Sequence, residues 1–203
     1  MESTITLKNI DNLYVRKIYD QHEYFHRVVD IFDESESAFR PSKDLLSVAG
    51  QILHVSMLIE YFLSGMFGSY EGLTPLSDSE LGFMDMSWTK IADEKDLHQV
   101  LDPARWSRPF MASTSVIEAL KLFDDVTDKA AELIGAMSLQ DFATAQPPIN
   151  PVLPPEKFQY PDILEVMNDH TAHHRGALVV YAHLLEKDPK MPYFDLKKVT
   201  GEN

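Results

Sequence analysis

The residues best suited to do chemistry are the histidines of DHTAHHRG, residues 169–176 of a chain that has eight histidines and no cysteine. On a helix, His170 and His174 lie four residues apart and share one face, so both imidazoles can reach a single metal ion. His173 points to one side, and we do not expect it to join them. The simpler alternative is a pair of core histidines hydrogen-bonded to backbone or carboxylate groups, because a buried imidazole without a partner costs a few kcal/mol.

A third histidine favours the metal hypothesis. His54 is the only histidine in LLSVAGQILHVSMLIEYFLSGMF, an otherwise apolar segment. If this helix faces the one that carries His170 and His174, three imidazoles meet and leave an open coordination position. Without cysteine the ligands must be imidazole or carboxylate, and Zn²⁺ or Ni²⁺ suits such a site without being selected by it. We predict a divalent-metal site at these three histidines, which Glu60, Asp169 or Tyr181 could help to orient.

The elements that would position these residues are helices. Apolar residues recur with helical spacing in four segments, and none shows strand alternation. Ser115 and Glu118 have the spacing of a capping box, and Pro161 suits a first helical position. We predict an all-α fold, a single domain over residues 1–203 in which four antiparallel helices form a bundle. The segments are residues 9–34, 45–67, 116–137 and 161–186, with long connections over residues 71–110 and 138–160, the second an extended excursion.

Another stretch, HEYFH at residues 22–26, matches the H-E-x-x-H pattern of zinc metalloproteases. In that alternative His22 and His26 bind zinc and Glu23 is the general base, with Glu60 as a further candidate ligand. The context does not favour it, because the motif normally lies behind a sheet that binds extended substrate. The other interpretation is that both histidines are partly exposed on a helix surface.

Charge and composition exclude several classes of partner. The net charge is −14, with acidic residues spread along the chain and no basic cluster, so we expect no binding to nucleic acid. Gln51, His54 and Glu60 interrupt the longest apolar segment, which favours a buried helix over a membrane span. The N-terminal sequence lacks the features of a secretion signal, and we expect a cytoplasmic protein.

The chain resembles the DinB-like superfamily of metal-binding four-helix bundles, which includes the YfiT-type proteins. Those proteins have a histidine in an apolar second helix and H-x-x-x-H-R-G in the last, matched here by His54 and by His170, His174, Arg175 and Gly176. The resemblance implies the bundle fold, the metal site and a homodimer. Some members are transferases that use low-molecular-weight thiols, so an external thiol or a metal-bound water is the expected nucleophile. The alternative is a non-enzymatic, stress-related protein in which the ion is structural.

Overall fold

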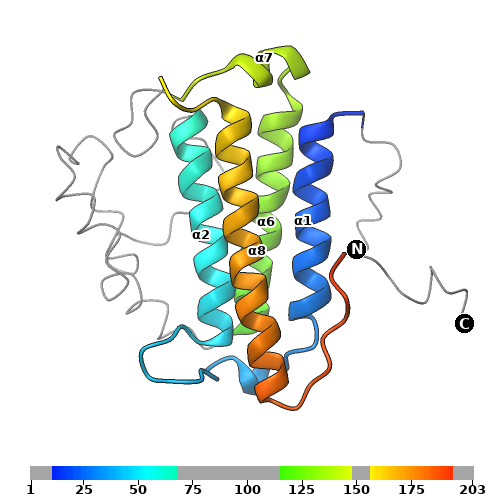
Figure 1. Ribbon diagram of the computed structural model, residues 1–203, viewed down its shortest axis with the longest axis vertical. Helices are drawn as coiled ribbons and strands as arrows, with labels where there is room; N and C mark the ends of the chain where they lie inside the picture. Colours follow the sequence, from blue (N-terminus) through cyan, green and yellow to red (C-terminus); the bar gives the residue numbers. More distant parts are fainter. Residues whose placement is uncertain (1–10, 68–114, 148–155, 194–203) are drawn as a thin grey trace, which may run out of the picture.

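The computed structural model describes residues 11–67, 115–147 and 156–193, and the structural statements below concern these residues. Four long helices lie side by side along the longest axis of the molecule, and a short one lies across one end (Figure 1). The described residues contain no strand, so the predicted all-α class is confirmed. The elements are α1 (Leu13–Val29), η2 (Glu34–Glu36, a 3-10 turn), α2 (Val48–Phe67), α6 (Val116–Gly135), α7 (Leu139–Thr144) and α8 (Tyr160–Leu184).

Local capping chemistry fixes where the helices begin. The Asn12 side chain accepts a hydrogen bond from the backbone N–H of Tyr14 at 2.9 Å and so caps α1. Ser115 Oγ accepts from the N–H of Glu118 at 3.0 Å, which confirms the predicted start of α6. Ser47 Oγ accepts from the N–H of Gly50 at 3.0 Å, so α2 begins at Val48, three residues later than its apolar run.

The helices form a closed ring in which α1 and α2 each pack against both α6 and α8. The start of α6 lies beside the α1–α2 connection, because Val116 N–H donates to Ser37 Oγ at 3.0 Å. The start of α8 lies at the far end, where the Tyr160 hydroxyl donates to the carbonyl of Met66. Consequently α2 runs antiparallel to α8 but parallel to α6 (Figure 1). The expectation of four antiparallel helices is wrong for α2 and α6, because both helices begin at the same end of the bundle.

The expected excursion over residues 138–160 is also corrected in part. Ser138 Oγ accepts from the N–H of Asp141 at 3.0 Å and starts the short helix α7. Phe142 of α7 is fully buried and packs against Tyr14 and Tyr160, with ring centroids 4.5 Å and 5.7 Å away, so it covers one end of the core. The expected connection over residues 71–110 lies outside the described residues.

The core fills the space between the four long helices. Its largest fully buried side chains include Phe25 of α1, Leu63 of α2, Phe123 of α6 and Leu178 of α8. Each helix therefore contributes an apolar face to one shared interior, which is the usual basis of bundle stability. Within the described part of the chain, no helix combines the length and apolar character needed to cross a bilayer.

Candidate metal centre

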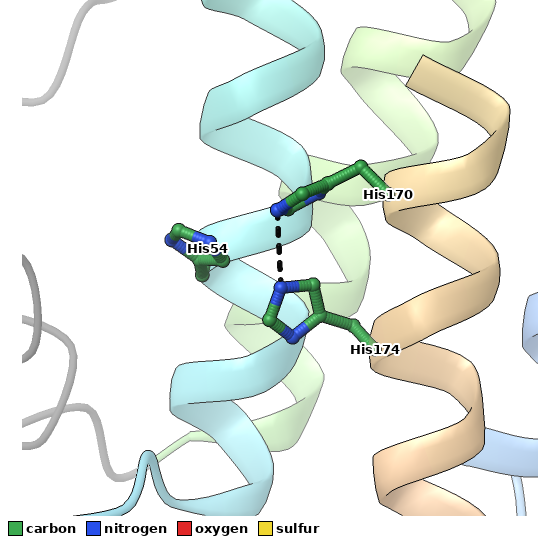
Figure 2. Close-up of side chains that lie close together, drawn as sticks. All are labelled: His54, His170 and His174. Atoms are coloured by element: carbon green, nitrogen blue, oxygen red, sulfur yellow. Dashed lines mark hydrogen bonds between the residues drawn. The ribbon is translucent and has the colours of Figure 1, made fainter. Parts of the chain in front are cut away.

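The three predicted ligands meet at the interface between α2 and α8. His54 projects from α2 toward His170 and His174, which project from neighbouring turns of α8 (Figure 2). The ring centroid of His54 lies 5.0 Å from that of His170 and 4.7 Å from that of His174. One nitrogen from each ring lies within 4.8 Å of one nitrogen from each of the others. We call these residues the three-histidine cluster.

The spacing within the cluster suits a small divalent ion. The Nε2 atoms of His170 and His174 are 3.1 Å apart. Two nitrogens bound to one tetrahedral zinc at about 2.0–2.1 Å stand roughly 3.3 Å apart, so this pair needs almost no rearrangement. His54 completes three nitrogen donors and leaves further coordination positions for a water or a substrate.

Burial keeps the cluster neutral. His54 and His174 are each 8% exposed, and His170 is partly buried. Burial, followed by the neighbouring imidazoles, lowers the pKa of His54 to about 3. Burial, followed by the neighbouring His173, lowers the pKa of His170 to about 4. Burial also lowers the pKa of His174, below that of His170, and the other three imidazoles add to this effect. All three are therefore neutral near pH 7, the state in which an imidazole nitrogen binds metal.

A hydrogen-bond chain sets the tautomer of His174. The Tyr181 hydroxyl donates to the carbonyl of Leu46 at 2.9 Å and accepts from Gln51 Nε2 at 3.1 Å. Gln51 Oε1 therefore faces His174 Nδ1, and a carbonyl oxygen can only accept. Nδ1 must carry the hydrogen, which leaves the Nε2 lone pair directed at the cluster. Tyr181 was among the predicted orienting residues, whereas Gln51, which contacts the ligand itself, was not.

The residue after His174 fixes the rotation of α8. Arg175 is 4% exposed and points away from the cluster toward α1, where it donates to Gln21 Oε1 at 2.9 Å. Its guanidinium carbon also lies 5.6 Å from the ring of Tyr24 and 5.2 Å from that of Tyr193. Because Arg175 is held on the α1 side, the two ligands of α8 are turned toward α2.

The remaining predicted residues lie outside the cluster. His173 is exposed, as the helical geometry indicates. Asp169 is exposed and lines an open groove of about 190 Å³ between α1 and α8, so it does not orient a ligand. Glu60 is 8% exposed, and burial raises its pKa, but its carboxylate is not part of the cluster.

The HEYFH residues lie at a different interface, between α1 and α6. His22 Nε2 and His26 Nε2 each lie 2.7 Å from the same atom, Oδ1 of Asp124. Glu23, the general base of the protease alternative, pairs instead with Arg27 one turn along α1. With no strand in the described residues to bind extended substrate, these contacts speak against the protease alternative.

Comparison with protein families places the chain in a known superfamily. Residues 17–178 match the sequence profile of the DinB superfamily, which covers most of the chain and includes all three histidines of the cluster. No curated protein and no solved structure gives a match.

Proposed function

Because the chain belongs to the DinB superfamily, whose association with metals agrees with a buried cluster of three histidines, we propose that it binds a divalent transition-metal ion, Zn²⁺ or Ni²⁺, and activates an external nucleophile there. When bound, the ion acts as a Lewis acid that lowers the pKa of a thiol or water in the open position. The activated nucleophile would attack an electrophilic centre of a small-molecule substrate and displace a leaving group from it.

The observation that carries this proposal is the arrangement of lone pairs. His174 is held by Gln51 in the tautomer that presents Nε2, and the Nε2 of His170 stands 3.1 Å away. A purely structural pair of core histidines needs only a hydrogen bond between the two rings. It does not need a third imidazole, that of His54, in contact with both.

The composition of the cluster favours a thiol over water. Within the described residues, the group of candidate ligands consists of three histidines and contains no Asp or Glu that could take a proton from the nucleophile. A thiol has a pKa near 8.5 and ionises at neutral pH with little help, whereas free water, at about 15.7, needs far more activation. The chain contains no cysteine, so this thiol must be a separate small molecule.

The experiment compares metal content and thiol turnover in the same preparations. We expect the wild type to bind about one equivalent of ion more than His54→Ala and His174→Ala do, and the same amount as the matched control His173→Gln. Thiol transfer to a panel of electrophilic substrates should follow metal content across these variants. An equal metal content in the wild type and in both alanine variants would place the ion elsewhere.

The same experiment separates the enzyme from a non-enzymatic alternative. A structural ion should raise the thermal unfolding midpoint in proportion to its occupancy while thiol turnover stays absent. The expected homodimer is part of the proposal and rests on family resemblance. Sedimentation equilibrium at micromolar concentration tests it, and a monomer mass would remove it.

A further inference from the structure

A second group of metal-binding side chains lies on the other side of the bundle. The three-histidine cluster occupies the α2–α8 interface, whereas His22, His26 and Asp124 meet at the α1–α6 interface. In the ring of helices, these two interfaces are opposite each other. We propose that His22, His26 and Asp124 form a second site for a first-row divalent ion, independent of the first.

The donor set is the first argument. Two histidines four residues apart on one helix place both imidazoles on the same face, and a carboxylate from a neighbouring helix completes a two-histidine, one-carboxylate set. Such a set binds Zn²⁺ or Fe²⁺ and leaves positions open for water. Carboxylate in place of a third imidazole makes this site chemically different from the three-histidine cluster.

Convergence of the ligand atoms is the second argument. Both Nε2 atoms lie 2.7 Å from Asp124 Oδ1, and the ring centroids of His22 and His26 are 4.4 Å apart. An ion with bonds of about 2.0–2.2 Å holds its ligand atoms roughly 3.0–3.4 Å apart. The nitrogen–oxygen distances need to open by only a few tenths of an ångström, which small side-chain rotations provide.

The outer contacts of the two rings are the third argument. His26 Nδ1 lies 2.9 Å from Oδ1 of Asp30, the arrangement in which a carboxylate orients a metal-binding histidine through its other nitrogen. The ring of His22 stacks on Phe123, with centroids 5.4 Å apart and an angle of 4° between the planes. Both rings are therefore held with Nε2 toward Asp124.

Access to solvent is adequate for an ion to enter. The side chains are 29% exposed for His22, 23% for His26 and 45% for Asp124. Burial lowers the pKa of His26, but without an ion its hydrogen bonds to Asp124 and Asp30 and the charges of these carboxylates together outweigh burial and raise the pKa to about 9. An ion has to displace that proton, so the test belongs at about pH 8 and not in acid.

The test uses the full-length His174→Ala variant, which removes one ligand of the first cluster. Its binding of Co²⁺, followed by visible absorption, and of Zn²⁺, followed by competition with a chromophoric chelator, should show one equivalent. Adding Asp124→Asn or His26→Gln should weaken that binding at least tenfold. Adding His183→Gln, a change at an exposed histidine of α8, should leave it unchanged.

Two results would overturn the proposal. One is a His174→Ala protein that binds no ion at millimolar metal, and the other is binding that is unaffected by both Asp124→Asn and His26→Gln. Circular dichroism of each apo variant shows whether it is folded. If His26→Gln does not fold, Asp124→Asn decides the question, because asparagine keeps the size of the side chain. Failure here leaves the three-histidine cluster untouched, since that cluster is tested by separate variants.

Discussion

Gln51 offers the sharpest test of how the three-histidine cluster is organised. This side chain is 6% exposed, and its Oε1 contacts Nδ1 of His174, the ring nitrogen that does not face the cluster. Replacing it with methionine keeps the length and apolar volume of the side chain but removes the acceptor for Nδ1–H. We predict that Gln51→Met weakens metal binding without unfolding the helix bundle.

The magnitude follows from which state loses the hydrogen bond. Without metal, His174 can move its hydrogen to Nε2, which faces His170 3.1 Å away, and so avoid a buried unpaired donor. With metal, Nε2 is a ligand and the hydrogen must remain on Nδ1, where the variant offers no acceptor. A buried unpaired donor costs about 1–3 kcal/mol, and about 1.4 kcal/mol is a tenfold change in affinity. We therefore expect a loss of roughly 10- to 100-fold, the usual range for an orienting partner of a metal ligand.

The assay is chelator competition at neutral pH, with the apo unfolding midpoint measured in parallel. Tyr181→Phe removes one of the hydrogen bonds that hold the Gln51 amide and should cause a smaller loss than Gln51→Met. Gln140→Met, at an exposed glutamine of α7, is the matched control and should bind like the wild type. An affinity for Gln51→Met within twofold of the wild type, in a protein that is folded, would refute the assigned tautomer.

Three further predictions concern pH and stability. Since burial lowers the pKa of His54 to about 3, metal affinity at the three-histidine cluster should vary little between about pH 6 and 8 and fall steeply in acid, as measured by chelator competition. A tenfold loss per unit from pH 8 to 6 would contradict this. Burial raises the pKa of Glu60, so this residue favours the folded state fully only below its unfolded pKa, and that stability is lost as pH rises through the folded pKa. Glu60→Gln should therefore raise the calorimetric unfolding midpoint at about pH 8, and the gain should shrink toward pH 4. Arg175→Met removes two hydrogen bonds and contacts with Tyr24 and Tyr193, and should cost roughly 2 kcal/mol, or a midpoint about 4–8 °C lower; an unchanged midpoint would mean that these contacts add no net stability.

Periodicity was sufficient to place the ligand-bearing faces of the helices. The four-residue spacing of His170 and His174, together with apolar neighbours, indicated an inward pair and turned His173 outward, as the structure has it. In the sequence, Gln51 stands out only as an interruption of an apolar segment. The role of Gln51 depends on its hydrogen bond with Tyr181, which is 130 residues away, and no local sequence pattern predicts a contact over that separation.

The partner of the HEYFH histidines could not be found for a similar reason. Glu60 was the candidate ligand from sequence, but α2 lies diagonally across the bundle from α1, while Asp124 of the adjacent helix α6 faces both rings. Choosing between the two carboxylates requires the order of helices around the ring. In that order α2 and α6 are parallel neighbours, an arrangement that the expectation of antiparallel helices does not contain. Whether either group of histidines binds metal stays a prediction.

The division of the three-histidine cluster between α2 and α8 has a consequence for timing. His174 and Gln51 are 123 residues apart in the sequence, so the N-terminal part of the site is synthesised long before the rest. At about 5–20 residues per second, a growing chain exposes His54 for several seconds or longer with neither of its partners available. Three-coordinate metal binding can begin only after α8 has left the ribosome and packed against α2. A bound ion would therefore mark a chain whose last long helix is already in place.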